Sequence, residues 1–271
     1  MKSILVHIHD DSGQKARLQA ALDLTRASGG HLTCLQITPY NEMVTLDPLG
    51  GAYALAVDMA QMREAEVASQ QTLEAQLHHE DVNWDWQHGE GDAATCLLRA
   101  SRLADVVVVT LPRGDRYYPG ALLPIVGDLV THCRSSVLAL PPAVGTIDIA
   151  GRALVAWDGS HEAAVALLRA TPLLKRASEV HVVMIEERDK PVFPPTDASI
   201  YLSRHGIYSE LHEWPRKDRT VEEALIHAIG ELKADWMVMG AFGHSRLRET
   251  IFGGVTRYLL AESPVPLLLA H

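Results

Sequence analysis

The chain contains an internal repeat, and this repeat restricts the possible folds more than any other feature of the sequence. The segment Ala104–Val109 matches Ala234–Met239 at an offset of 130 residues. The same offset pairs Val137–Ala139 with Leu267–Leu269, so no gap is needed over this stretch. Repeat units of solenoid proteins are much shorter than this, and the period therefore indicates a duplicated domain.

The start of the repeat and its boundary divide the chain into two domains. Leu5-Val6 matches Leu154-Val155 at an offset of 149, so the first half holds about 19 more residues in its middle. Two prolines and a glycine in Pro141–Thr146 interrupt both helix and strand patterns. A length of 271 residues is also typical of two compact domains. We expect the domains to span residues 1–141 and 150–271.

Within each half, short apolar runs alternate with stretches of helical periodicity, which is typical of βαβ units and a parallel sheet. This pattern predicts an α/β fold of two tandem Rossmann-like domains, each a five-stranded parallel sheet with helices on both faces. The ligand crevice of such a sheet lies at the carboxyl ends of the strands, where the strand order reverses. The expected strands are Ile4–Ile8, Leu32–Ile37, Val82–Trp86, Asp105–Leu111 and Val137–Leu140, and then Leu154–Ala156, Val180–Ile185, Ile207–Leu211, Trp236–Met239 and Leu267–Ala270. The expected helices include Lys15–Ser28, a long polar-faced stretch from Ala52 to His79, Gly91–Leu103, Leu122–His132, Glu162–Arg176, Val221–Leu232 and Val255–Ala261.

Composition and charge exclude several classes of function. The 34 acidic and 24 basic side chains give a net charge of -10, which repels phosphate backbones and anionic lipid. No apolar run approaches the roughly 20 residues needed to cross a bilayer, and Asp10 and Asp11 come too early for a secretory signal. The three cysteines, an odd number without a CxxC spacing, predict core residues of a reducing compartment. We expect a cytoplasmic protein that binds neither nucleic acid nor membrane.

Glycines follow the fourth expected strand of the second half, where bare backbone suits an anion. Gly240 and Gly243 frame the segment Met239–Ser245, and Gly253-Gly254 precedes the next expected helix. Glycines can adopt positive φ and point N–H groups at an anion, and a helix N-terminus adds further donors. The spacing matches neither a Walker P-loop nor a dinucleotide fingerprint. The glycines alone are equally consistent with an anion site and with a structural role, in which Gly240 and Gly243 form a tight turn and Gly253 marks a helix boundary.

At this point the sequence resembles the universal stress protein family, whose nucleotide-binding members carry Gly-x2-Gly-x9-Gly-Ser/Thr after the fourth strand. Gly240, Gly243 and Gly253 fall on that motif. Val155–Ser160 resembles the family's Ala-x-Asp-Gly-Ser, and Ser263–Leu269 resembles the segment before its last strand. Together these segments cover the second half of the chain, and the duplication fits the tandem members of the family.

The resemblance implies that the second half binds ATP or a related adenine nucleotide, with or without Mg²⁺, and that the protein acts as a sensor or adaptor in a stress response. Asp158 would lie beside the adenine and ribose, and the glycines would surround the ribose and phosphates. The implied nucleotide-binding residues are Ala156, Trp157, Asp158, Met239, Gly240, Gly243, His244, Gly253, Gly254, Val255 and Thr256. From its type and place, Asp158 is equally suited to be the N-cap of the following helix.

One position departs from the family's motif. Gly254 stands where the family has Ser or Thr, and a lost hydrogen bond to a charged phosphate costs ~1.5 to 3 kcal/mol. Thr256, in the first turn of the expected helix, offers a hydroxyl that would compensate in part. If it does not, the site is weakened or lost.

The first half lacks the phosphate-binding residues. At the offset of 130, Thr110, Arg113, Leu123 and Pro124 replace Gly240, Gly243, Gly253 and Gly254. His9 takes the position of Asp158 at the offset of 149, although a slip of one residue would restore an acid. We expect a degenerate first domain with a role in packing, dimerisation or recognition of another ligand.

Other readings of the chain remain open at this stage. A slow ATPase or related hydrolase of the same fold is one, although no nucleophile or general base is evident, so no catalytic residues are assigned. A non-nucleotide interaction protein with an unidentified protein partner is another. A zinc site formed by His7, His9, His78, His79 and His88 is conceivable, but the sequence favours surface or core histidines. Finally, we expect the two last strands to pair within the chain as a pseudo-dimer, because each would otherwise leave an open edge. We also expect two chains to form a homodimer.

Overall fold

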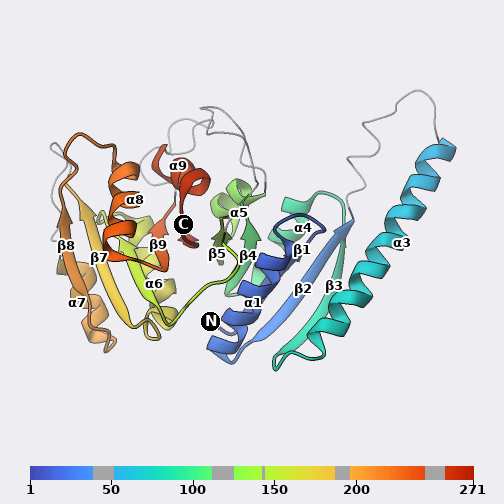
Figure 1. Cartoon of the computed structure of the whole chain (residues 1–271), viewed down its shortest axis with the longest axis horizontal. Helices are drawn as coiled ribbons and strands as arrows, with labels where there is room; N and C mark the ends of the chain where they lie inside the picture. The colour runs from blue at the N-terminus through green and yellow to red at the C-terminus, as the bar shows by residue number, and fades with distance from the viewer. Residues whose placement is uncertain (39–51, 112–124, 142–143, 187–195, 242–253) are drawn as a thin grey trace.

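The computed structural model describes residues 1–38, 52–111, 125–141, 144–186, 196–241 and 254–271 of the chain. Figure 1 shows strands and helices that alternate along both halves. The strands are β1 Ser3–Ile8, β2 His31–Thr38, β3 Asn83–Glu90, β4 Val106–Thr110, β5 Ser136–Leu140, β6 Arg152–Ala156, β7 Glu179–Ile185, β8 Glu210–Trp214, β9 Trp236–Gly240 and β10 Leu267–Ala270. The helices are α1 Gln14–Ser28, α3 Ala52–Leu77, α4 Ala93–Ala100, the 3-10 helix η1 Ser101–Leu103, α5 Val126–His132, α6 His161–Leu174, α7 Thr196–Arg204, α8 Val221–Leu232 and α9 Gly254–Glu262.

The ten strands form one continuous sheet in the order β3-β2-β1-β4-β5-β10-β9-β6-β7-β8. All pairs within each half are parallel, and only β5 and β10, at the centre, pair antiparallel. Each half is therefore the five-stranded parallel sheet that the sequence predicts. In both halves the strand order reverses between the first and fourth strands, which are β1 and β4 in one half and β6 and β9 in the other.

The strand register reproduces both offsets of the repeat. Val6 pairs with Val108 in the first half, and Val155 pairs with Val238 in the second. These pairs are related by 149 residues on one strand and by 130 on the other. The duplication in the sequence is therefore also a duplication of the sheet.

The central β5–β10 pair joins the halves. Leu138 lies opposite Leu268, its own equivalent at the offset of 130, so an approximate twofold axis passes between these two residues. Both side chains are almost completely buried, at 1% and 2% exposed. The pairing of the two last strands within the chain, expected because each would leave an open edge, is present.

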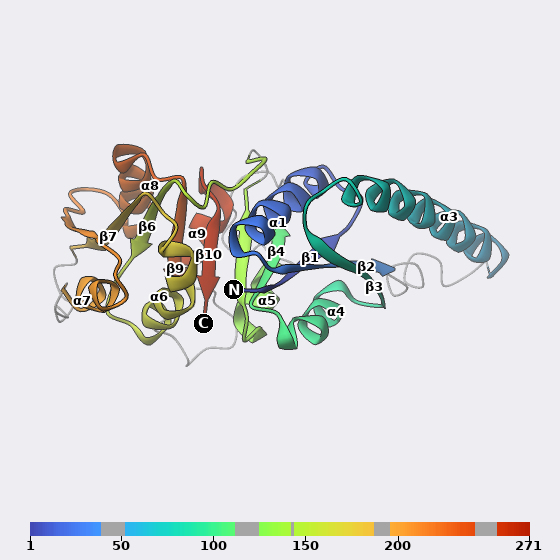
Figure 2. The ribbon, with the colours of Figure 1, turned by 90° about the horizontal axis from the view of Figure 1, so that it is seen from below.

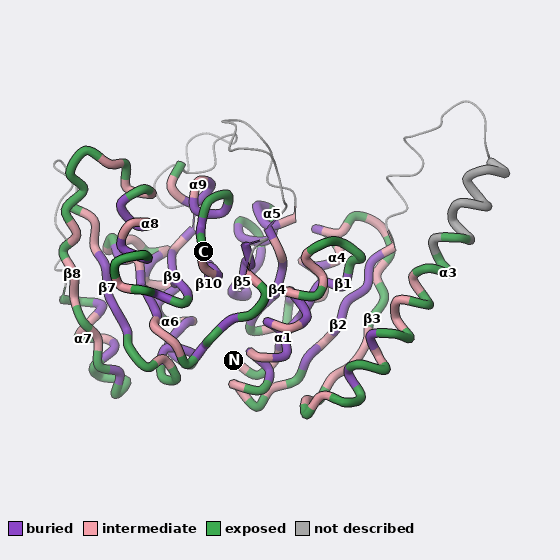
Figure 3. The backbone as a smooth tube through the Cα atoms, viewed as in Figure 1, coloured by how far each residue is buried: buried purple, intermediate pink, exposed green. Residues whose placement is uncertain are grey.

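Helices cover both faces of the sheet, and each face has its own core. Helices α1, α6 and α7 contribute to one core, together with the end of α3, whereas α4, α5, α8 and α9 contribute to the other. Figure 2 shows helices on either side of the sheet, and Figure 3 shows that the central strands are buried and that exposure increases on the outer helices. Among the described residues, Cys34 and Cys133 are buried free cysteines and Cys96 is half-buried.

The expected strand Ile207–Leu211 is wrong by about three residues, because β8 runs from Glu210 to Trp214. Helix α7, which the sequence analysis did not predict, ends just before it. Gly206 has a φ of +73°, and the N–H of Ile207 donates to the carbonyl of Leu202 at 3.0 Å. Ile207 is buried against α7 rather than paired in the sheet, so its apolar character reflects the end of the helix.

Within the described part of the chain, none of the helices is both long and apolar enough to cross a membrane.

Candidate functional site

The candidate site lies where the strand order reverses in the second half. Strands β6 and β9 are parallel neighbours there, with Val155 opposite Val238, so their carboxyl ends lie side by side. Ala156, Trp157 and Asp158 stand at the end of β6, and Met239 and Gly240 end β9. The structure therefore brings these five sequence-predicted residues to one edge of the sheet.

Hydrogen bonds fix the loop between β6 and α6. The N–H of Trp157 donates to the carbonyl of Val183 at 2.9 Å, which extends the β6–β7 pairing by one residue. The carboxylate of Asp158 accepts from the N–H of Ser160 at 2.9 Å, and Gly159 turns the chain with a φ of +74°. Ser160 is the N-cap of α6, because its hydroxyl accepts from the N–H of Ala163 at 3.1 Å.

Asp158 is therefore not the helix cap, and that alternative from the sequence is wrong. Its side chain is exposed, and it shapes the loop through its contact with Ser160. Trp157 is only 8% exposed and belongs to the core beneath the loop, whereas Ala156 is half-buried. Among Ala156, Trp157 and Asp158, only Asp158 is exposed.

Gly240 allows β9 and α6 to approach each other closely. A Cβ at this position would lie 2.4 Å from the nitrogen of Ala163 and 2.5 Å from the carbonyl carbon of Glu162. Both atoms belong to the backbone of the first turn of α6, so no side-chain rotation would relieve the contact. Any residue larger than glycine would push the loop that carries Asp158 away from the end of β9.

Gly254 is in a different environment, at the first residue of α9. It is exposed, and a Cβ there would meet no atom of the described residues within 4 Å. Val255 is half-buried, and Thr256 is 5% exposed, so little of the Thr256 side chain is open to a ligand. The predicted residues Gly243, His244 and Gly253 lie outside the described residues.

In the first half, the side chain of Arg17 of α1 lies at the corresponding edge of the sheet, between the carboxyl ends of β1 and β4. It is 1% exposed. Its Nε donates to the carbonyl of His7 at 2.5 Å and one Nη donates to the carbonyl of His9 at 2.8 Å. The other Nη lies 3.2 Å from the carboxylate of Asp11 and also donates to the hydroxyl of Thr110. One guanidinium group thus links the carboxyl ends of β1 and β4.

In the first half the glycine of this contact is on the helix side rather than on the strand. Thr110 occupies the position of Gly240, and Gly13 occupies the position of Glu162 at the offset of 149. A Cβ on Gly13 would lie 2.7 Å from the hydroxyl oxygen of Thr110. The glycine is on the strand in the second half and at the start of the helix in the first, and in both halves it makes room for the residue opposite.

Sequence comparison gives the family of the chain. A model of the universal stress protein family matches residues 1–141 and, a second time, residues 150–271. The chain belongs to the universal stress protein family. In sequence, no curated protein matches it.

Solved structures agree with this assignment at the level of the fold. The chain is similar to a universal stress protein from Archaeoglobus fulgidus, with a TM-score of 0.71 and 18% identity over 98% of this chain and 97% of that chain. It is also similar to a putative universal stress protein from Pseudomonas aeruginosa, with a TM-score of 0.64 and 15% identity over 100% of this chain and 93% of that chain. The tandem arrangement of the universal stress protein fold therefore extends over nearly the whole of both chains.

The histidines that the sequence offered as a zinc site do not come together in this universal stress protein. The rings of His7 and His9 stack, with centroids 5.7 Å apart, but His78 and His88 contact different tryptophans. Burial, with a smaller effect of Arg17, lowers the pKa of His7 from 6.5 to about 3. Among the described residues, the group with ligand atoms close enough to hold a metal is instead His181, Glu210 and His212 in the second half.

Sequence reasoning missed both this cluster and Arg17. Arg17 had a visible signal, because it stands at a position of α1 whose equivalent in α6 is Ala166. A basic residue in place of a buried alanine indicates a partner at the end of the sheet. The histidine cluster had a weaker signal, the alternating Glu210-Leu211-His212, which has meaning only once its neighbouring strand is known.

Proposed function

We propose that this universal stress protein binds ATP or a related adenine nucleotide, with or without Mg²⁺, in its second domain and acts as a stress-response sensor or adaptor. The observation that carries the proposal is the convergence of an exposed carboxylate, Asp158, and the close-packed Gly240 at the point where the strand order reverses. Open α/β sheets bind their ligands in this crevice.

The contacts around Asp158 suit a ribose. One carboxylate oxygen accepts a hydrogen bond from the N–H of Ser160, and this bond fixes the side chain within the loop between β6 and α6. An exposed carboxylate placed in this way can accept hydrogen bonds from the hydroxyl groups of a sugar. Gly240 keeps the start of α6, and with it the loop that carries Asp158, close to the end of β9.

The first domain supports the assignment of a single site. Arg17 donates to the carbonyl groups of His7 and His9 and pairs with Asp11, so its guanidinium group occupies the carboxyl ends of β1 and β4. A nucleotide entering there would have to displace a buried guanidinium group. Displacement would leave the buried carbonyl group of His7 without this donor, at a cost of ~1 to 3 kcal/mol.

Calorimetric titration with ATP tests the proposal. We expect about one site per chain, and Asp158→Ala should weaken binding about tenfold to 100-fold, the equivalent of a lost hydrogen bond to a charged group. The matched control is His9→Ala, the equivalent position of the first domain, which is also exposed. The control should bind like the wild type. Equal losses in both variants, or two sites per chain, would contradict a site confined to the second domain.

Mass spectrometry of small molecules released from the denatured protein separates the competing functions. A co-purifying adenine nucleotide supports binding. A diphosphate formed from added ATP would support the slow ATPase instead. No released nucleotide together with no titratable site would leave the interaction protein as the remaining function.

Adding the missing hydroxyl at Gly254 tests whether the phosphates of the nucleotide contact the start of α9. Because a Cβ there comes within 4 Å of none of the atoms in the described part of the chain, a serine fits beside these residues. Gly254→Ser should therefore tighten ATP binding by about tenfold or more. Unchanged affinity would mean that the phosphates do not reach the start of α9.

The predicted homodimer cannot form through the edges of β5 and β10. Strands β5 and β10 already pair within the chain, so the remaining sheet edges are β3 and β8. Light scattering of the full chain measures whether two copies associate.

A further inference from the structure

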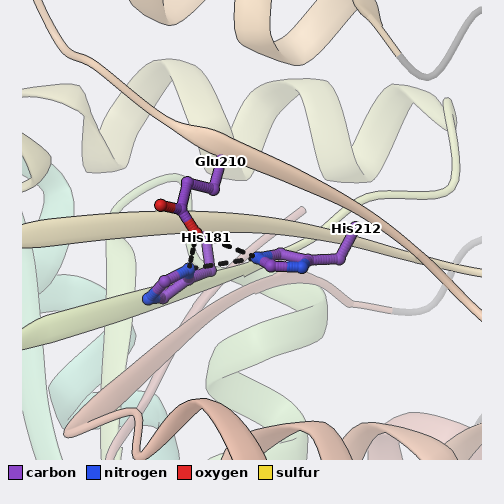
Figure 4. Close-up of side chains that lie close together, drawn as sticks. All are labelled: His181, Glu210 and His212. Atoms are coloured by element: carbon purple, nitrogen blue, oxygen red, sulfur yellow. Dashed lines mark hydrogen bonds and ion pairs between the residues drawn. The ribbon is translucent and has the colours of Figure 1, made fainter.

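Three metal-ligating side chains converge on the two outer strands of the second domain. His181 of β7 pairs in register with Glu210 of β8, and His212 lies two residues further along β8, opposite Val183. Glu210 and His212 lie on the same face of β8, since alternate residues of a strand do so. Figure 4 shows the three side chains pointing toward one another.

The three ligand atoms lie at the spacing of a metal site. Nδ1 of His181 is 3.1 Å from Nε2 of His212 and 3.6 Å from the nearer carboxylate oxygen of Glu210, and the same oxygen is 3.8 Å from Nε2 of His212. Tetrahedral zinc with ligands at about 2.0 to 2.1 Å places neighbouring ligand atoms about 3.3 to 3.4 Å apart. Shifts of less than about half an ångström would bring all three atoms into the first coordination sphere.

The second nitrogen of His181 faces a carboxylate. Nε2 of His181 is buried and makes no hydrogen bond to a described residue, and the carboxylate oxygen of Glu179 that contacts Nε of Arg152 at 3.2 Å lies 3.4 Å from it. Ligating histidines almost always direct their other N–H to such a group, which fixes the tautomer and raises the basicity of the ligating nitrogen. A proton on Nε2 leaves the lone pair of Nδ1 directed at Glu210 and His212.

The cluster is both anchored and accessible. The side chain of His181 is 6% exposed and that of His212 is 24% exposed, whereas that of Glu210 is 60% exposed. Glu179, His181, Tyr208 and Glu210 line a groove of about 290 Å³ at the amino ends of β7 and β8. The groove gives an ion a path from solvent and room for a water molecule as the fourth ligand.

We propose that His181, Glu210 and His212 bind a divalent transition-metal ion, with Zn²⁺ as the best match to two imidazoles and one carboxylate. The ion would link β8, an edge strand, to β7. Because these residues lie toward the amino ends of their strands and the proposed nucleotide site lies at the carboxyl ends, the two sites do not compete. The metal site also does not depend on the nucleotide site.

Zinc titration of the tag-free full chain, after treatment with a chelator, tests the proposal. We expect about one Zn²⁺ per chain by calorimetry and elemental analysis, and a higher Tm when Zn²⁺ is added. Replacement of Zn²⁺ by Co²⁺ should give the visible absorption of a four-coordinate site. His212→Gln removes one ligand from a partly exposed position and should weaken binding at least 100-fold, and Glu179→Gln should weaken it about tenfold to 100-fold through His181.

His88→Gln is the matched control, because His88 is an exposed strand histidine of the first domain. It should bind Zn²⁺ like the wild type. Absence of Zn²⁺ binding by the wild type would overturn the proposal and leave a hydrogen bond between two imidazoles. The proposal would equally fail if His212→Gln kept full affinity, or if His88→Gln lost as much affinity as His212→Gln.

Discussion

Two glycines of the same motif should respond in opposite ways to an added methyl group. Gly240→Ala would bring a Cβ within 2.4 and 2.5 Å of two backbone atoms of α6, whereas ordinary contacts of a Cβ begin at 3.4 Å. The backbone must therefore move by about 1 Å, and overpacking of this kind costs ~1 to 3 kcal/mol. We expect the upper end of that range, because α6 also packs against β10 at the centre of the sheet.

Gly254→Ala is the matched control. Within the described ranges, a Cβ at this position meets no atom within 4 Å, and alanine restricts the unfolded chain more than glycine does. This variant should stabilise the protein by ~0.4 to 1 kcal/mol. The free energies of unfolding of the two variants should therefore differ by about 3 to 4 kcal/mol.

Urea unfolding followed by circular dichroism measures both free energies under the same conditions. A Gly240→Ala protein within about 0.5 kcal/mol of the wild type would refute the packing role of this glycine. The motif would then require glycine at this position for the ligand alone. A loss of stability in Gly254→Ala would contradict the open environment described for the start of α9.

Three further predictions concern the first domain and the central contact. Arg17→Met should destabilise the protein by ~1 to 3 kcal/mol in thermal or urea unfolding, because it leaves the buried carbonyl group of His7 without its donor; a loss below about 0.5 kcal/mol would show that water replaces the guanidinium group. Leu268→Lys would place a charge beside Leu138 at the centre of the sheet and should separate the halves in limited proteolysis; unchanged Tm and unchanged cleavage would contradict this. The pKa of His7 is lower in the folded chain, at about 3, than in the unfolded chain, at 6.5, so the unfolded state binds the additional proton between these values. Stability should therefore fall by up to about 1.4 kcal/mol per pH unit as the pH decreases from about 6.5 to 3, and His7→Leu should reduce this slope in urea unfolding at several pH values.

The repeat, the alternation of apolar runs with helical stretches and the open edges of the last strands together predicted the fold and the central contact. Its two offsets describe the pairing of β1 with β4 and of β6 with β9, because equivalent residues of a duplicated sheet keep the same register. The prediction was wrong where an apolar residue had another partner. Ile207 belongs to the end of α7 rather than to a strand, and a periodic pattern does not distinguish the two kinds of burial.

The surroundings of the site were less accessible from the sequence. The motif identified Gly240, but its contact with the first turn of α6 depends on how a helix lies on a strand 78 residues away from Glu162 in the chain. The histidine cluster depends on the register of β7 and β8, which fixes His181 opposite Glu210. The sequence shows which residues are available, whereas the pairing of strands decides which of them meet.

Thr110 and Gly13 stand in the first domain where Gly240 and Glu162 stand in the second, and this combination limits which single substitutions the first domain can accept. Restoring glycine at 110 alone would remove the hydroxyl partner of the buried Arg17, and restoring glutamate at 13 alone would drive its Cβ into Thr110. Replacing Arg17 alone would leave the carbonyl groups of β1 without their donor. Each single step back toward an open crevice lowers stability before any ligand can compensate for it. A domain with this arrangement is therefore held in it by its own stability, whereas its surface is free to diverge.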